Sequence, residues 1–256
     1  MKIIIESDMH SGDIYGLANP RNVSDRYREL AELLFDWRVK KIEEIGKIDA
    51  HLCPGELTEG PGKKSTLELW TTDMEEQAEA SAELLAMWDC PQYYMTYASA
   101  YHAGDQLKTD NLVVDKLKLN HSRAADIKRV QRLVLNGLKV NVFHVVGGGS
   151  TPESFARALM KGVAVDVVRG AYRGYGPADL YIRGHSHVYG EVRNDKWHAV
   201  NAPCLKWPNG MYGGKIDRPF YAMGLMELTI NSREDWDLKT HIFRYKSEEE
   251  EYHEIT

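Results

Sequence analysis

The sequence has few cysteines, no long apolar run and no excess of positive charge. Its 256 residues include three cysteines, Cys53, Cys90 and Cys204, an odd number without metal-site spacing. Their number and spacing argue against a disulfide framework and favour reduced thiols in a cytoplasm. A net charge of −6 argues against charge-driven binding to nucleic acid or to an anionic membrane. Because no stretch approaches the roughly 20 apolar residues of a membrane span, we expect no membrane partner.

The chain does have enough apolar residues for one large core. Hydrophobic residues make up 43% of the sequence, which supports a single domain over residues 1–246, followed by an acidic tail over 247–256. Apolar runs predict strands over 2–5, 48–53 and 93–97, separated by helices over about 24–45 and 72–88. This alternation is typical of parallel strands joined by helical crossovers.

A different pattern follows after about residue 110. Two β-prone runs, 130–135 and 138–146, flank Asn136-Gly137, which predicts a hairpin. Thr151 and Pro152 then predict the start of a helix that runs to about Val168. The two halves together indicate an α/β protein with mixed sheets.

Two pairs of metal-competent side chains stand at predicted strand ends. Asp8 and His10 follow the first strand, and His185 and His187 follow an apolar run that stops at Gly184. Because side chains alternate along an extended chain, residues two apart project to the same side. Ligands collect at the carboxyl ends of strands in open α/β sheets. The two pairs therefore predict a metal site, which the chain can approach closely at the glycine.

With three further loop residues, these pairs resemble the motifs of the calcineurin-like metallophosphoesterases. That family's pattern is D-x-H, G-D-x-x-D/G, G-N-H-D/E, an isolated histidine and G-H-x-H, each at a strand end. The D-x-H and G-H-S-H blocks match outright, His144 fits the isolated histidine, and the resemblance covers about residues 1–190. The run D-L-Y-I-R-G-H-S-H-V-Y over 179–189 is similar to phage- and prophage-borne members. The resemblance implies a four-layer αββα sandwich of two mixed β-sheets flanked by helices.

Two blocks depart from the family's pattern, and both departures bear on the second metal ion. Glu56, in G-E-L-T-E-G, stands where the family has aspartate, so its carboxylate is one methylene further from the backbone. Tyr101 stands where the family has the asparagine ligand before the histidine, here His102. Water or Ser99 could supply the missing oxygen, since Mg²⁺ and Mn²⁺ accept oxygen ligands freely.

The resemblance implies a divalent-metal-dependent phosphoesterase that hydrolyses phosphodiester or phosphomonoester bonds by attack of a metal-bound hydroxide. It implies one ion on Asp8, His10 and His187, a second on His144 and His185, a bridge from Glu56, and His102 assisting the leaving group. We expect Mn²⁺, with Fe, Zn²⁺ and Mg²⁺ as alternatives. Tyr101 and Arg183 are candidates for contacting substrate, and a surface ion pair is an equal alternative for Arg183.

Two alternative functions remain open at this point. A phage-type DNA or RNA nuclease of the same fold is suggested by the sequence around Arg183 and opposed by the acidic charge. A degenerate, non-catalytic metal-binding or structural module is suggested by Glu56 and Tyr101. The expected partner is a phosphoester, with nucleotides and nucleic acid among the options, and the expected location is the cytoplasm, within the host cell for a phage-encoded chain. Asp13 and Glu59 are expected to be solvated, and His121 to lie in a loop.

Overall fold

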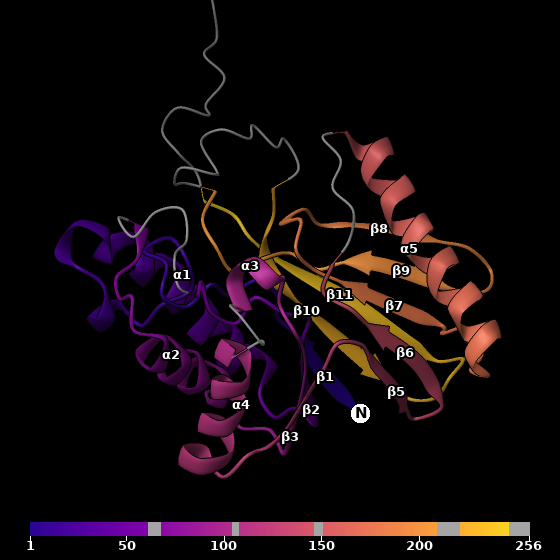
Figure 1. Cartoon of the computed structure of the whole chain (residues 1–256), viewed down its shortest axis with the longest axis horizontal. Helices are drawn as coiled ribbons and strands as arrows, with labels where there is room; N and C mark the ends of the chain where they lie inside the picture. The colour runs from indigo at the N-terminus through magenta and orange to yellow at the C-terminus, as the bar shows by residue number, and fades with distance from the viewer. Residues whose placement is uncertain (61–67, 104–107, 146–150, 209–220, 246–256) are drawn as a thin grey trace, which may run out of the picture.

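Two mixed sheets occupy the centre of the computed structural model, which describes residues 1–60, 68–103, 108–145, 151–208 and 221–245 (Figure 1). The acidic tail expected at 247–256 lies outside these residues. The strands are β1 (Lys2–Ile5), β2 (Ala50–Cys53), β3 (Gln92–Thr96), β4 (Ala124–Lys128), β5 (Gln131–Leu135), β6 (Leu138–Val142), β7 (Leu180–Arg183), β8 (Gly190–Arg193), β9 (His198–Asn201), β10 (Met223–Ile230) and β11 (Trp236–Phe243). The helices are η1 (Pro20–Asn22), α1 (Asp25–Ile45), α2 (Met74–Ala86), α3 (Ala100–Ala103), α4 (Lys108–His121) and α5 (Pro152–Arg173).

The first sheet has the strand order β11-β10-β1-β2-β3-β4. Strands β1 to β4 run parallel to their neighbours, with Ile4 opposite His51 and His51 opposite Tyr93. Strand β10 pairs antiparallel with β1 and with β11. The sequence therefore places the carboxyl ends of β1, β2 and β3 at one edge of this sheet.

The second sheet has the order β5-β6-β7-β9-β8. The predicted hairpin around Asn136-Gly137 is confirmed, because β5 pairs antiparallel with β6. Strands β6, β7 and β9 are parallel, so the carboxyl ends of β6 and β7 also lie together.

Alternating side chains create three apolar layers that hold the sheets and helices together. Ile3 and Ile5 of β1 face Val140 and Ile182 in the core between the two sheets. Helices α1, α2 and α4 cover the outer face of the first sheet, while α5 lies on the outer face of the second (Figure 1). The predicted four-layer αββα sandwich of mixed sheets is confirmed.

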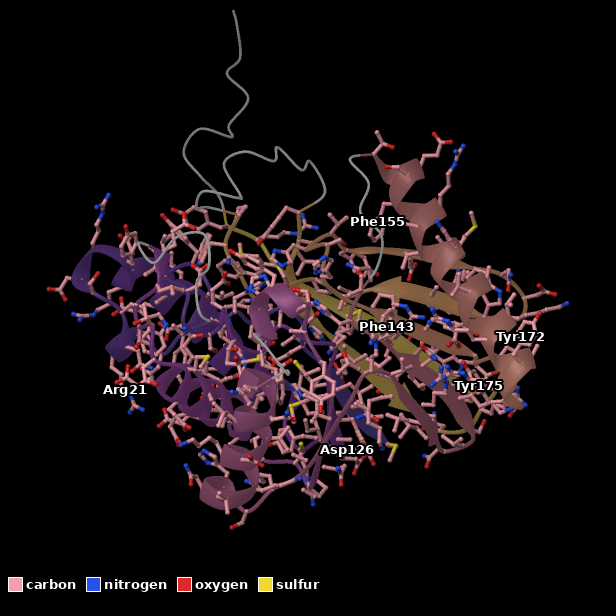
Figure 2. The ribbon with its side chains drawn as sticks, viewed as in Figure 1. Arg21, Asp126, Phe143, Phe155, Tyr172 and Tyr175 are labelled. Atoms are coloured by element: carbon pink, nitrogen blue, oxygen red, sulfur yellow. The ribbon has the colours of Figure 1, made fainter. Side chains whose placement is uncertain are left out.

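Local signals in the sequence explain where most helices begin and end. Thr151 and Ser154 form a reciprocal capping box at the start of α5, and Gly174 ends the helix with a φ of 76°. This end lies beyond the predicted Val168. Phe155 at one end of α5 packs in a small apolar cluster, and Tyr175, just past the other end, contacts Arg132 (Figure 2).

Helix α4 and strand β4 are not predicted from the sequence. His121, expected in a loop, is the last residue of α4. Val113 and Leu117 bury this helix against the first sheet, so tertiary packing stabilises it. Among the described residues, no helix combines the length and apolarity needed to cross a bilayer.

Candidate metal centre

The loops that follow five parallel or hairpin strands meet at one edge of the sandwich. Each loop supplies one or two polar side chains immediately beyond the carboxyl end of its strand. They are Asp8 and His10 after β1, Glu56 after β2, His102 after β3, His144 after β6, and His185 and His187 after β7. The structure therefore brings together all the metal and catalytic candidates of the sequence.

The backbone at this edge is unusual, because five of these residues adopt a left-handed conformation that favours glycine. Their φ angles are 54° at Asp8, 51° at His10, 49° at Glu56, 77° at His185 and 55° at His187. Non-glycine residues in this region each cost on the order of 1 kcal/mol and cluster at functional sites. The loops therefore aim these side chains inward at an energetic cost.

Glu56 lies at the middle of the cluster and is 1% exposed. Its Oε2 is 3.0 Å from His10 Nε2 and 3.7 Å from His187 Nε2. Its Oε1 is 3.0 Å from His144 Nε2 and 3.1 Å from His185 Nδ1. Each carboxylate oxygen thus faces its own pair of imidazoles, and the longer glutamate side chain still reaches both.

Asp8 completes the donor group on the Oε2 side. Its Oδ1 is 3.7 Å from His187 Nε2, and the carboxylate accepts hydrogen bonds from Ser7 Oγ and from the backbone N–H of His185. Two groups of donor atoms share Glu56, each with all its atoms within 4.8 Å of one another: Asp8, His10, Glu56 and His187, and Glu56, His144 and His185. A third group of this kind consists of His10, Glu59 and His102.

Outer hydrogen bonds fix which nitrogen of three imidazoles faces the cluster. His10 Nδ1 donates to Glu59 Oε2 at 2.6 Å, His102 Nδ1 donates to the Glu59 carbonyl at 2.9 Å, and His144 Nδ1 donates to the Pro54 carbonyl. When these rings are neutral, their Nε2 atoms carry lone pairs directed inward.

These inward lone pairs give a direct test of whether the residues fit a metal. Nε2 of His10 lies only 3.0 Å from Nε2 of His187, and the buried Nε2 of His144 has no hydrogen-bond donor among the described residues. Acceptor atoms that face one another repel unless a cation lies between them. Carboxylate and imidazole donors in this arrangement fit divalent ions such as Mn²⁺, Fe²⁺ and Zn²⁺.

The electrostatics of the ion-free cluster agree with its affinity for positive charge. Burial raises the pKa of Glu56, but His102, His144 and the hydrogen bond from His10 outweigh it and hold that pKa well below its ordinary value. Burial and Lys206 lower the pKa of His10, but Glu59 and Glu56 together raise it to about 9. The cluster therefore stabilises positive charge on its imidazoles.

His102 lies at the rim of the cluster, in the short helix α3. Its Nε2 is 3.7 Å from Glu56 Oε1, and its ring centroid is 4.8 Å from that of His10. Tyr101 contacts His102 edge-on, with ring centroids 4.8 Å apart. Ser99, considered from the sequence as a replacement oxygen, donates instead to Glu56 Oε1 at 3.1 Å.

Arg183 is the candidate that the structure does not bring into the site. Its side chain is 4% exposed and donates to the carbonyls of Asn141 and Ile182. Its guanidinium lies 5.5 Å from the ring of Tyr181, beneath α5. Because side chains alternate along β7, Arg183 shares the helix-facing side with Tyr181 and can reach neither substrate nor surface.

Sequence reasoning misses four residues around the cluster. Glu59, expected to be solvated, is 13% exposed and contacts His10, and Asp13 is buried with Lys206. Lys206 and Tyr221 carry no motif and come from a distant part of the chain. Only the i+3 spacing of Glu56 and Glu59, both in the same loop, gives a signal for any of them.

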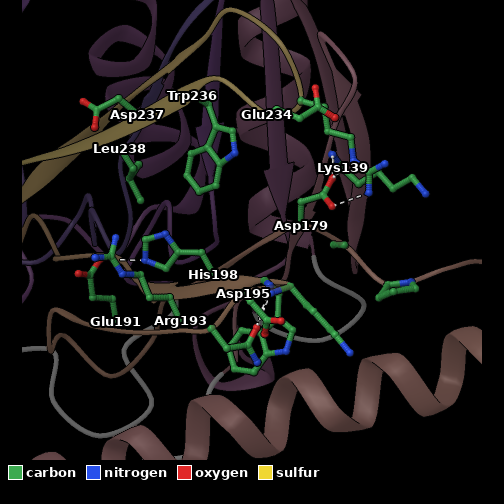
Figure 3. A pocket seen from close by; sticks show the side chains of 16 residues that line it. Lys139, Asp179, Glu191, Arg193, Asp195, His198, Glu234, Trp236, Asp237 and Leu238 are labelled. Atoms are coloured by element: carbon green, nitrogen blue, oxygen red, sulfur yellow. Dashed lines mark hydrogen bonds and ion pairs between the residues drawn. The ribbon is translucent and has the colours of Figure 1, made fainter.

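A cavity of 890 Å³ lies away from this cluster, at the amino ends of β7 and β9 (Figure 3). His198 and Trp236 stack in it with ring centroids 5.9 Å apart, and His198 pairs with Glu191 at 2.9 Å. It contains none of the metal-cluster residues.

No protein-family model matches the chain, and no curated protein matches it. Solved structures do, with 81 similar chains. A Vps29 single mutant from Entamoeba histolytica is 12% identical, covering 95% of this chain and 100% of that one, with a TM-score of 0.49. An archaeal phosphodiesterase is 13% identical over 94% and 100%, with a TM-score of 0.47. A predicted phosphoesterase from Streptococcus pneumoniae is 10% identical over 94% and 97%, with a TM-score of 0.41.

Two of these similar structures are thus a phosphodiesterase and a predicted phosphoesterase. The phage type suggested by residues 179–189 stays a prediction. Because every TM-score above is below 0.5, the function of the site rests on its own residues.

Proposed function

We propose that this protein is a divalent-metal-dependent phosphoesterase that hydrolyses phosphodiesters. The observation that carries the proposal is the position of Glu56, whose two oxygens each face a separate pair of imidazoles. Asp8, His10 and His187 would hold one ion, His144 and His185 the other, and Glu56 both. When bound, the ions supply an acidified water and neutralise the phosphoryl oxygens.

Side chains of the protein would assist departure of the leaving group and contact the substrate. His102 is held through Nδ1 by the Glu59 carbonyl, so Nε2 faces the site, and the imidazolium form of the ring gives its Nε2 proton to the leaving oxygen. Burial, the largest influence, lowers the pKa of His102, so this imidazolium is a stronger acid than a free one. Tyr101 is proposed as a substrate contact beside His102, whose ring it meets edge-on.

The donor geometry admits several ions and substrates, so our choice among them uses further arguments. Mn²⁺ is the ion we propose, followed by Zn²⁺, because both accept mixed carboxylate and imidazole donors. The nucleic-acid alternative rests on the phage-like sequence around Arg183, and because that side chain is buried we do not propose it as a contact to such a substrate.

The test is hydrolysis of a chromogenic phosphodiester by the full chain with added Mn²⁺. We expect metal-dependent turnover that falls about 10²–10⁴-fold in His102→Ala. His121→Ala is the matched control, because His121 ends α4 outside the cluster. Absence of turnover in the wild type, with metal bound, would favour the degenerate module. Metal-dependent cleavage of a labelled oligonucleotide, absent for the small diester, would favour the nuclease.

A further inference from the structure

Residues 204–207 run alongside the loop that follows β1 and place Lys206 next to the candidate metal centre. The backbone N–H of Leu205 donates to the carbonyls of Ser7 and Asp8, and that of Trp207 donates to Tyr15 at 2.8 Å. Lys206 itself pairs with Gly16 in an isolated bridge. The segment is therefore fixed against the chain that carries Asp8 and His10.

The side chain of Lys206 reaches the outer partner of His10. Its Nζ forms ion pairs with Asp13 and with Glu59, the latter at 3.1 Å. The same Glu59 oxygen, Oε2, accepts the hydrogen bond from His10 Nδ1. The Lys206 side chain is 15% exposed, so this ion pair is shielded from water and holds Glu59 in place.

The main chain of Lys206 reaches the outer partner of the opposite imidazole. Its carbonyl accepts a hydrogen bond from Tyr221 Oη at 2.6 Å. Having donated its proton there, the Tyr221 hydroxyl accepts from His187 Nδ1 at 3.2 Å. His187 is thereby left with Nε2 directed inward, facing Nε2 of His10 at 3.0 Å.

We propose that Lys206 is a positioning residue for the ion held by Asp8, His10 and His187. Its two ends support the outer hydrogen bonds of both imidazoles, although it contacts neither. Loss of an outer partner typically weakens metal affinity 10–100-fold, because ring orientation and ligand basicity are lost, and without the Lys206 ammonium group Glu59, the outer partner of His10, loses the ion pair that holds it. The inference rests on the metal centre of the proposed function.

The experiment measures Mn²⁺ and Zn²⁺ binding to the full chain by titration calorimetry. Lys206→Met removes the ammonium group and keeps the carbonyl, and we expect 10–100-fold weaker binding of one ion. Because that variant removes the cation shared by the carboxylates of Asp13 and Glu59, the double variant Lys206→Met/Asp13→Asn, with one fewer carboxylate, is measured beside it. Lys206→Arg, which keeps the cation, should recover most of the affinity.

Combining Lys206→Met with a ligand substitution separates positioning from general loosening of the fold. In a His144→Ala background the loss should persist, since that histidine belongs to the other donor group. In a His10→Ala background it should shrink toward zero, because the imidazole being positioned is gone. Equal losses in both backgrounds, or unchanged affinity in Lys206→Met, would overturn the proposal.

Hydrolysis by the wild type is measured in parallel to keep the two proposals distinct. Ion binding without hydrolysis overturns the proposed function and leaves the role of Lys206 standing. Hydrolysis with unaltered ion binding in Lys206→Met overturns only the role of Lys206. A wild type that binds neither ion overturns both.

Discussion

Gly184→Ala should disturb the metal centre without removing any donor atom. Gly184 precedes His185, and a β-carbon added there would lie 2.9 Å from the Pro54 carbonyl oxygen and 3.0 Å from Asp8 Oδ2, and closer still to Ser7 Oγ. All three groups bear on the donor atoms: the Pro54 carbonyl orients His144, Ser7 Oγ donates to Asp8, and Asp8 is itself a candidate ligand. None can retreat without moving a loop that carries a ligand.

The expected cost is that of overpacking a tight interior site, about 1–3 kcal/mol. For a chain of this size that corresponds to a fall in Tm of roughly 2–12 °C. Metal affinity should fall as well, because the Asp8 carboxylate must shift. Thermal unfolding of the metal-free protein and calorimetric titration with Mn²⁺ measure the two effects separately.

Gly162→Ala, in the interior of α5, is the matched control. A β-carbon there would meet only the Arg183 Nε, at 4.0 Å, and alanine favours a helix by up to about 1 kcal/mol over glycine. We expect an unchanged or slightly higher Tm and unchanged metal binding. If Gly184→Ala behaves like Gly162→Ala in both assays, the close packing around Gly184 does not shape the site.

Four other perturbations test the remaining physical arguments. His102→Ala should lower kcat while leaving calorimetric Mn²⁺ affinity within about threefold, since His102 lies outside the two donor groups that share Glu56. A large loss of affinity would contradict its catalytic role and point to the donor group that it forms with His10 and Glu59. Burial raises the pKa of Asp110 to about 7, and the hydrogen bond from the Ala98 N–H offsets part of this rise. The folded state therefore keeps a proton that the unfolded state releases near pH 4. The free energy of unfolding should accordingly fall as pH rises from about 4 to 7. Urea unfolding at pH 5 and 7.5 should show a smaller difference in Asp110→Asn than in the wild type. Arg38→Met should cost about 3–5 kcal/mol in urea unfolding, because the fully buried Glu6 carboxylate loses its ion pair at 2.8 Å and keeps the His51 imidazole at 3.0 Å. A loss below about 1 kcal/mol would show that His51 alone stabilises the Glu6 carboxylate. At a free Mn²⁺ concentration of about 100 times Kd, binding should stabilise the folded protein by about 2.7 kcal/mol. Removal of the metal with EDTA should therefore lower Tm by roughly 5–10 °C. An identical Tm with and without Mn²⁺ would argue against binding.

The sequence predicts the core of the fold because its signals are local. The runs at 2–5 and 93–97, the Asn136-Gly137 turn and the Thr151 cap each specify an element without help from the rest of the chain. Helix α4 is not predicted in this way, because its apolar pattern is short and its stability comes from contact with α2 and the first sheet. Tertiary packing decides such segments.

The same distinction between local signals and long-range packing applies to the candidate metal centre. Strand ends carry the donor residues, and parallel pairing brings those ends together, so the sequence predicts the cluster. The position of Arg183 also follows from alternation, since Ile182 faces the inter-sheet core and its neighbour must face α5. Lys206 and Tyr221 reach the cluster only through long-range placement of the segments after β9 and before β10. No spacing rule links them to His10 or His187.

The left-handed backbone at the donor positions has a consequence for anyone using this chain as a scaffold. Glycine at Asp8, His10, Glu56, His185 or His187 would adopt the observed φ without steric strain. A designer who wanted only a robust αββα framework would therefore choose glycine there, remove buried charge at the same time, and obtain a more stable protein that binds no metal. Substitutions that raise thermostability by relieving backbone strain would therefore replace these candidate metal ligands before other residues. A stabilised variant library from this chain should accordingly hold these five positions fixed.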